Sequence, residues 1–152
     1  MGGGMVLVYE RMETMIRYVV GFLFNGDLVA LIQKNRPEWQ KGKLNGIGGH
    51  IEDGESAEVA MVREFQEETG GWTLQSDWRK FALLTNAKKS VELHLFTNRN
   101  VVPIKTTTDE MVAWYPVNYL PDNIIPNLRW LIPMAKHENT FMADIVFDTD
   151  MW

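Results

Sequence analysis

Strand-like patterning is clearest near the start of the chain, where β-branched and aromatic residues dominate two stretches separated by a polar triplet. Residues 17–24 and 28–33 are these stretches, and Asn25-Gly26-Asp27 lies between them. An Asn-Gly step between two hydrophobic runs is typical of a tight β-hairpin turn. We therefore expect the two stretches to pair as a hairpin.

The middle of the chain predicts a helix with both of its ends marked. Ser56 is a suitable N-cap, residues 57–69 follow a helical pattern, and Gly70-Gly71 provides a C-terminal stop. Residues 46–51, just before this helix, are rich in glycine. Such a stretch forms a strand only where the backbone must approach another group closely.

Further strands and one more helix are expected in the rest of the chain. Residues 35–45 form a polar loop, the stretches 78–84, 91–98 and 111–117 have strand patterns, and a second helix is expected over 126–136. Strands with interspersed helices on one chain predict an α/β sandwich with a mixed sheet.

Length and composition indicate one ordinary globular domain. The chain has 152 residues, of which 45% are hydrophobic and 23% charged, close to globular averages. We expect residues 1–14 to be a flexible leader and residues 15–152 to form the domain, with its core over 17–136 and an extension over 137–152. The tail 139–152 is interpreted as an extra strand, a lid or a contact in a homodimer, and the sequence leaves these alternatives open.

Composition also excludes several classes of protein. The chain contains no cysteine, which excludes disulfides and thiolate zinc sites. Its net charge of −5 disfavours a nucleic acid polymer as partner. The longest apolar run, residues 18–24, is far shorter than the roughly 20 residues that span a membrane. We therefore expect a cytoplasmic protein that binds neither a nucleic acid polymer nor a membrane.

Acidic residues are concentrated in one segment. Residues 49–71 contain seven carboxylates and a single basic residue, Arg63, so their local charge is −6 while the rest of the chain is close to neutral. An acidic centre on a near-neutral body points to a divalent cation. Glu64, Glu67 and Glu68 are three and four residues apart and therefore share one face of the expected helix. This face is either a solvated acidic surface or a site for Mg²⁺ or Mn²⁺.

The spacing around these glutamates decides between the two. From Gly49 the chain has five residues, Glu55, seven residues and then Arg-Glu-Phe-Gln-Glu-Glu-Thr-Gly over 63–70. This pattern resembles the Nudix box, GX5EX7REUXEEXGU, in which U is a bulky aliphatic residue. Phenylalanine is accepted at the first U, and Gly71 at the second is the one departure. The resemblance to the Nudix hydrolase superfamily extends more weakly over residues 17–136.

The resemblance implies a fold, a reaction and a metal. The fold is a Nudix-type α/β/α sandwich with a central mixed sheet, and the protein is a pyrophosphohydrolase that acts on a nucleotide substrate with Mg²⁺ or Mn²⁺. The implied metal ligands are the Gly49 carbonyl, Glu64, Glu67 and Glu68. Arg63 would orient the glutamates, and Gly48 would let the backbone close on the phosphates. Glu55 is interpreted as a supporting partner of the glutamates.

A second acidic position lies downstream, in the polar run of residues 106–111. Many Nudix enzymes place an extra glutamate in a loop here, just before a strand. Glu110 is therefore predicted to be a metal ligand or the general base, and the alternative is an ordinary exposed loop acid. The predicted catalytic residues are thus Arg63, Glu64, Glu67 and Glu110. His50 and His94 are interpreted as structural.

The residues that lead into the box indicate the substrate. Residues 42–49 resemble the Asn-Gly-Phe-Gly-Gly segment of the MutT-type enzymes, which hydrolyse oxidised purine nucleoside triphosphates. This resemblance implies that Asn45 and Asn127 read the base, and the alternative is that both cap turns. Ile125 and Leu128 depart from that group, because they stand where it can have a stacking tryptophan and a second base-reading acid.

The loop before the glycines supplies cations and an aromatic ring. Arg36 and Lys43 are predicted to meet the phosphate tail, unless they are simply solvated, and Trp39 either stacks on a base or packs in the core. The favoured function is Mg²⁺-dependent hydrolysis of a purine (deoxy)nucleoside triphosphate, oxidised or not, to the monophosphate and pyrophosphate. The alternatives are a Nudix hydrolase of ADP-ribose, a nucleotide sugar or another nucleotide conjugate, and a non-enzymatic nucleotide-sensing module.

Overall fold

The first two strands form the predicted hairpin. The computed structural model describes residues 15–137 and 141–147, and in it β1 (Ile16–Asn25) pairs antiparallel with β2 (Leu28–Gln33). Gly26 in the turn has φ = 56°, a left-handed conformation that glycine adopts without a steric penalty. The hairpin and its turn are therefore confirmed.

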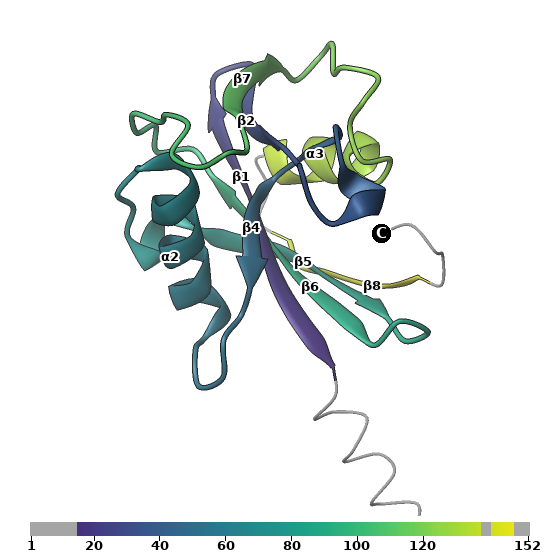
Figure 1. The fold of residues 1–152 in the computed structure, drawn as a ribbon. Helices are drawn as coiled ribbons and strands as arrows, with labels where there is room; N and C mark the ends of the chain where they lie inside the picture. The colour runs from purple at the N-terminus through teal and green to yellow at the C-terminus, as the bar shows by residue number, and fades with distance from the viewer. Residues whose placement is uncertain (1–14, 138–140, 148–152) are drawn as a thin grey trace, which may run out of the picture.

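Among the described residues, eight strands form one mixed sheet (Figure 1). The other six strands are β3 (Leu44–Asn45), β4 (Ile47–His50), β5 (Arg79–Asn86), β6 (Val91–Asn98), β7 (Val112–Pro116) and β8 (Ala143–Phe147). The strand order is β3-β2-β1-β6-β5-β8, with β4 also paired to β1 and β7 to β2. The β1–β6 and β5–β8 pairs are parallel and the other pairs are antiparallel. The mixed sheet that the sequence predicts is confirmed.

Residues 143–147 form a strand at the edge of this sheet. β8 pairs in parallel with β5, so this part of the tail supplies the extra strand, one of the three alternatives for it. Val146 on this strand is 76% exposed. The leader predicted at residues 1–14 and the chain end at 148–152 lie outside the described residues.

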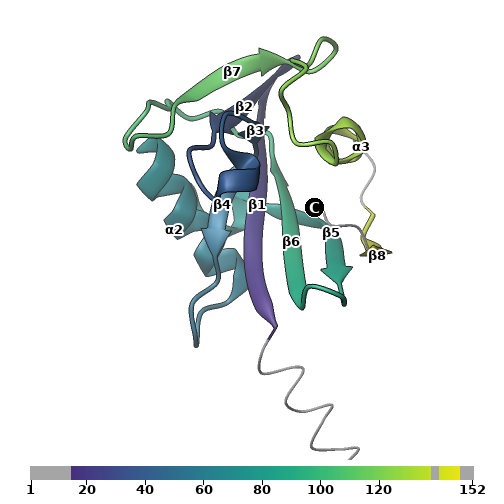
Figure 2. The same cartoon turned by 45° about the vertical axis from the view of Figure 1, so that its right-hand side comes forward.

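Two α-helices of the described chain cover opposite faces of the sheet, which makes an α/β/α sandwich (Figure 2). α2 (Ala57–Thr69) begins after Ser56, whose hydroxyl accepts a hydrogen bond from the backbone N–H of Val59. It ends at Gly70, where φ is 72°. Both predicted helix ends are therefore confirmed. α3 (Leu128–Lys136) lies on the other face. Neither helix of the described chain has the length and hydropathy of a membrane span.

The segment between β2 and β4 is more ordered than its polar composition predicts. It contains the short 3-10 helix η1 (Glu38–Gln40) and the two-residue strand β3. A second 3-10 helix, η2 (Gln75–Asp77), follows α2. The loop predicted over residues 35–45 is thus partly replaced by regular structure, which fixes the side chains of η1 relative to the sheet.

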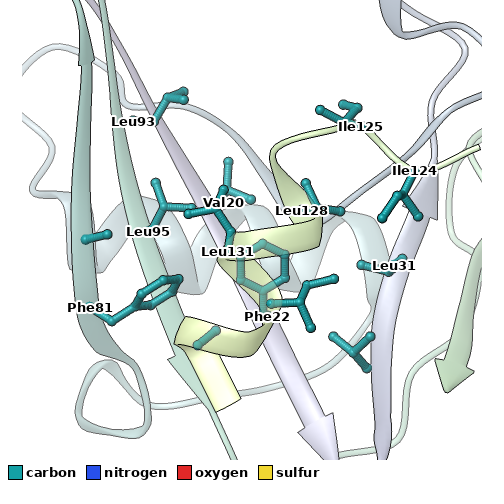
Figure 3. Close-up of a cluster of buried hydrophobic side chains, with 14 of the residues drawn as sticks. Val20, Phe22, Leu31, Phe81, Leu93, Leu95, Ile124, Ile125, Leu128 and Leu131 are labelled. Carbon is teal, nitrogen blue, oxygen red and sulfur yellow. The ribbon is translucent and has the colours of Figure 1, made fainter. Parts of the chain in front are cut away.

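The two faces of β1 contribute to two separate hydrophobic clusters. Val20 and Phe22 pack with residues of α3 in the cluster shown in Figure 3, whereas Val19 and Leu23 pack with residues of α2. Successive side chains of a strand point to opposite faces of the sheet, so a strand that is buried on both faces contributes alternate residues to the two clusters. Each large side chain that is fully buried contributes about 1.5–3 kcal/mol. The second cluster therefore holds α2 firmly against β1 and β4.

Candidate active site

The three glutamates of α2 are not equally buried. Glu64 and Glu68 line a cavity, whereas the side chain of Glu67 is 53% exposed and does not line it. Successive helical residues are rotated by about 100°, so positions four apart are nearly aligned and Glu67 is turned away from both. The expectation of one shared face therefore needs refinement, because two carboxylates face inward and the third lies at the flank.

Arg63 links the carboxylates of the acidic segment. Its guanidinium donates hydrogen bonds of 2.7 and 2.8 Å to Glu55 and one of 2.8 Å to Glu64 Oε1. It also donates to the His50 carbonyl at 3.0 Å and to Glu67 Oε2 at 3.3 Å. The two-fold contact with Glu55 is the main reason why the pKa of Arg63 is raised and that of Glu55 lowered. Arg63 is thus anchored by one carboxylate and holds another in place.

The glycines of β4 let the main chain approach both β1 and α2. A Cβ atom added to Gly48 would lie 1.8 Å from the carbonyl oxygen of Val19. A Cβ atom added to Gly49 would lie 2.5 Å from Cδ of Glu64. The close backbone approach expected for this glycine-rich stretch is therefore confirmed.

The pKa of Glu68 is strongly shifted by the surroundings of its carboxylate. Burial raises its pKa to about 8, with the charges of Glu64 and Glu110 adding to the shift and that of Lys34 opposing it. Burial also raises the pKa of Glu64. Oε2 of Glu68 is buried and has no hydrogen-bond partner. A divalent cation would supply both the missing partner and the missing positive charge.

The donor chemistry of this cluster fits a divalent metal, although the described residues do not form a complete set of metal ligands. Across residues 15–137 and 141–147, no three carboxylate or imidazole groups stand together as a metal site. Glu67 contacts Arg63, and Glu110 contacts Lys34. The unpartnered oxygen of Glu68 is therefore the feature that best suits a hard cation such as Mg²⁺ or Mn²⁺.

Glu110 reaches the same cavity from the loop before β7. The residue is 6% exposed, and its carboxylate accepts hydrogen bonds from Lys34 Nζ at 3.2 Å and from the backbone N–H of Asn35 at 2.6 Å. Its charge adds to the raised pKa of Glu68, and both residues line the cavity. Glu110 is therefore buried in the site, and the interpretation as an exposed loop acid is wrong.

The cavity joins these carboxylates to a wall of aromatic and amide side chains. Its volume is about 640 Å³, within the range of cavities that hold small-molecule ligands. The wall includes Tyr18, Trp39, Gln40 and Asn45. The ring of Tyr18 packs on His50 with centroids 4.4 Å apart. A ligand in this cavity would therefore meet acidic groups, rings and amides together.

The structure brings only some of the predicted substrate-binding residues to this cavity. Arg36, Asn45 and Gly48 line it, whereas Lys43 and Asn127 do not. Asn127 precedes α3 without a side-chain capping hydrogen bond, and its Nδ2 is buried without a partner. The turn-capping alternative therefore does not apply to Asn127.

The cavity residues that sequence reasoning misses include Lys34, Gln40 and Lys89. Lys34 contacts Glu110, which is 76 positions away, and no periodicity or motif signals such a contact. A weak signal exists for Gln40, because it follows Trp39 in the loop that leads into the glycines. The position of Gln40 could thus be suspected from the sequence, but its partner could not.

A comparison with protein families shows which family the chain belongs to. The NUDIX domain model matches residues 15–135, which is most of the chain. The chain belongs to the Nudix family. As a Nudix hydrolase it is a pyrophosphohydrolase that acts on nucleotide substrates, and Nudix hydrolases generally use divalent metals. The resemblance inferred from the box is therefore confirmed.

The relatives of this Nudix hydrolase are named after different substrates. The oxidized purine nucleoside triphosphate hydrolase of Mus musculus is 24% identical over 140 residues, covering 90% of this chain and 89% of that protein. The mutator MutT protein of Bacillus halodurans has a TM-score of 0.70 at 17% identity and covers 91% and 94% of the two chains. An ADP-ribose pyrophosphatase of Streptococcus suis has a TM-score of 0.64 at 18% identity, covering 86% and 99%. Identities this low between structures show the shared α/β/α fold and leave the substrate open.

The stability of the metal-free Nudix hydrolase is expected to fall as the pH rises from 4.5 to about 8. The pKa of Glu68 is raised from 4.5 to about 8 in the folded protein, so in this window the folded state holds a proton that the unfolded chain has released. Each pH unit then costs up to about 1.4 kcal/mol in the free energy of unfolding. The raised pKa of Glu64 acts in the same direction.

Chemical denaturation in EDTA across this pH window measures the slope. The stabilisation is fully present below pH 4.5 and lost by the upper end of the window. Glu68→Gln should flatten the slope, because glutamine does not titrate. Equal slopes in wild type and variant would show that Glu68 is not the group responsible.

Proposed function

We propose that this Nudix hydrolase cleaves a purine (deoxy)nucleoside triphosphate, oxidised or not, to the monophosphate and pyrophosphate with Mg²⁺ or Mn²⁺. The observation that carries the proposal is one continuous cavity, whose walls contain Glu64, Glu68, Glu110 and the buried amide of Asn45. Carboxylates suit a metal-bound phosphate chain, and an amide beside aromatic rings suits a base. The name of the Mus musculus relative supports the same class of substrate.

The metal would be held by the set that the Nudix box implies. These ligands are Glu64, Glu67, Glu68 and the Gly49 carbonyl. When bound, the metal would offset the negative charge of the phosphates and lower the pKa of the attacking water. The buried, unpartnered Oε2 of Glu68 supports this assignment. Arg63 holds Glu64 in position through a hydrogen bond of 2.8 Å.

Cationic groups at the cavity would bind the phosphate chain. Lys34, Arg36 and Lys89 line it, and Gly48 provides main chain without a side chain. Charge-assisted hydrogen bonds from such groups are stronger than neutral ones. Lys43 stays a predicted phosphate contact from the neighbouring loop, although it does not line the cavity.

A purine preference that depends on Asn45 and Asn127 is the expected result of this proposal. The Ile125 N–H donates to the Leu44 carbonyl at 2.9 Å, which brings the segment before α3 beside β3 and its Asn45. A buried amide left unpaired by the wrong base costs about 1–3 kcal/mol, or about 5- to 150-fold in kcat/KM. Asn45→Ala and Asn127→Ala should each reduce the ratio of purine to pyrimidine kcat/KM by a factor in this range.

Steady-state kinetics with purine and pyrimidine triphosphates test this prediction. Asn118→Ala is a matched control, because Asn118 is an exposed asparagine that does not line the cavity. A purine preference that is absent, or that survives both substitutions intact, would show that Asn45 and Asn127 do not read the base. The metal chemistry of α2 would still stand in that case.

A nucleotide conjugate such as ADP-ribose or a nucleotide sugar is the alternative substrate. The ADP-ribose pyrophosphatase of Streptococcus suis supports it, since it shares the fold over 86% of this chain. The products distinguish the two proposals, because ADP-ribose yields AMP and ribose 5-phosphate, whereas a triphosphate yields pyrophosphate. A cytoplasmic location and a homodimer also stay predictions. β8, at the edge of the described sheet, offers an unpaired strand edge to a second copy of the chain.

A further inference from the structure

Gln40 lies in the wall of the cavity with its amide oxygen already in use. The residue is 6% exposed and is the last residue of η1. Asn45 Nδ2 donates a hydrogen bond of 3.2 Å to Gln40 Oε1. Asn45 Oδ1 in turn accepts one of 2.8 Å from the backbone N–H of Gly46. Hydrogen bonds therefore connect the main chain of Gly46, through Asn45, to Gln40.

The backbone N–H of Gly46 sets the orientation of both amides. A main-chain N–H can only donate, so the Asn45 atom that faces it is the oxygen. Asn45 consequently directs its nitrogen at Gln40, which must meet that nitrogen with its own oxygen. The orientation of the Gln40 amide thus follows from the hydrogen bonds and is not a choice between two equivalent rotamers.

Nε2 is the polar side-chain atom of Gln40 that is left for a ligand. No hydrogen bond found among residues 15–137 and 141–147 uses this atom. The fully buried side-chain atoms without a hydrogen-bond partner do not include Nε2 of Gln40, so part of the surface of this atom is accessible. Gln40 is one of the residues that line the cavity. The Gln40 amide therefore has unused N–H donors, whereas its oxygen already accepts a hydrogen bond from Asn45.

We propose that Gln40 is a specificity-determining residue that donates a hydrogen bond to the base, and that the site prefers a 6-oxopurine to a 6-aminopurine. The proposal rests on the proposed binding of a purine nucleotide in this cavity. A keto oxygen accepts from Nε2, whereas an exocyclic amine would place two donors face to face. The mismatch corresponds to about 5- to 150-fold in kcat/KM. Besides its own proposed contact with the base, Asn45 positions Gln40, since it decides which end of the Gln40 amide is left for a ligand.

Two nearly isosteric substitutions should invert the preference. Asn45→Asp keeps an oxygen for the Gly46 N–H and replaces Nδ2 by a second oxygen. Gln40 must then turn its amide over to donate to that oxygen, and it presents Oε1 to the base. Gln40→Glu presents an oxygen directly while still accepting from Asn45. A merely structural role for Asn45 would lower activity on both bases alike and would leave their ratio unchanged.

The experiment compares kcat/KM for inosine triphosphate and adenosine triphosphate, whose bases differ only in the group at position 6 and the accompanying proton at N1. We expect a ratio of about 5 to 150 in wild type, a ratio below one in Asn45→Asp and Gln40→Glu, and a ratio near one in Gln40→Leu. Glu38→Gln is the matched control, because Glu38 lies in η1, is exposed and does not line the cavity. Its ratio should equal that of wild type.

Two results would overturn the role of Gln40. One is a wild type without a preference for the 6-oxopurine. The other is an unchanged ratio in the Asn45→Asp and Gln40→Glu variants, with thermal unfolding showing that both are folded. Failure of the proposed function is distinguishable, because it appears as no hydrolysis of any triphosphate. The hypoxanthine and adenine forms of ADP-ribose, compared by the same ratio, then decide whether Gln40 reads the base.

Discussion

Replacing Glu68 by glutamine is expected to lower kcat by about two to four orders of magnitude, because a metal contributes several kcal/mol of charge stabilisation in the transition state. Glutamine preserves the size of the side chain and removes the charge that would hold the metal. The pKa of about 8 shows that the metal-free folded protein already favours a neutral group at this position. The free energy of unfolding in EDTA should therefore stay the same or rise.

Glu67→Gln and Glu52→Gln complete this comparison. Glu67→Gln is expected to cause a loss of the same order, since the box implies that Glu67 is also a ligand. Glu52 is an exposed acid of the same segment that does not line the cavity, so Glu52→Gln should leave kcat unchanged. Titration of Mn²⁺ into each protein without substrate gives a second readout. Wild-type kcat and wild-type metal affinity in Glu68→Gln would show that this carboxylate is not a ligand.

Glu110→Gln is expected to lower kcat by about 10²- to 10⁴-fold at a nearly constant KM, which is the usual contribution of a general base. The carboxylate is buried in the cavity and close enough to Glu68 to raise its pKa. A group that acts only as the transition state forms contributes little to ground-state binding, so KM should hardly change.

Glu110→Gln is also expected to change the stability of the protein, and this change can be measured separately from kcat. The glutamine amide cannot accept from both Lys34 Nζ and the Asn35 N–H as the carboxylate does, so a stability loss of about 1–3 kcal/mol is expected as well. Thermal unfolding reports this loss. Asp122→Asn, at an exposed loop acid that does not line the cavity, should change neither kcat nor stability. An unchanged kcat in Glu110→Gln would leave Glu110 with a structural role only.

Local signals explain which parts of the fold could be predicted from the sequence. The Asn25-Gly26 step sets the hairpin turn, and Ser56 and Gly70 set the ends of α2, through contacts that span only a few residues. The same is true of Glu64 and Glu68, whose alignment follows from helix geometry. These features depend little on the rest of the chain.

Contacts between distant segments explain what the sequence could not predict. The Lys34–Glu110 pair joins residues 76 positions apart, and the parallel pairing of β8 with β5 depends on where the tail crosses the sheet. Lys43 is two positions from Asn45, and Asn127 is predicted from the resemblance to the MutT-type enzymes, but neither residue lines the cavity.

The exposure of Glu67 has a similar origin. The rotation of α2 about its axis is set by the packing of Met61 and Phe65 in the core, both of which are fully buried. The spacing of the glutamates fixes their angles relative to one another and does not fix which of them faces the cavity. The environment of each carboxylate therefore required the tertiary structure.

The most direct test of the account is the identity of the products formed from a purine triphosphate such as dGTP with Mg²⁺. We expect nucleoside monophosphate and pyrophosphate in equal amounts, and no turnover above background when EDTA removes the metal. Formation of nucleoside diphosphate and orthophosphate, or undiminished turnover in EDTA, would contradict metal-dependent pyrophosphohydrolysis at this site.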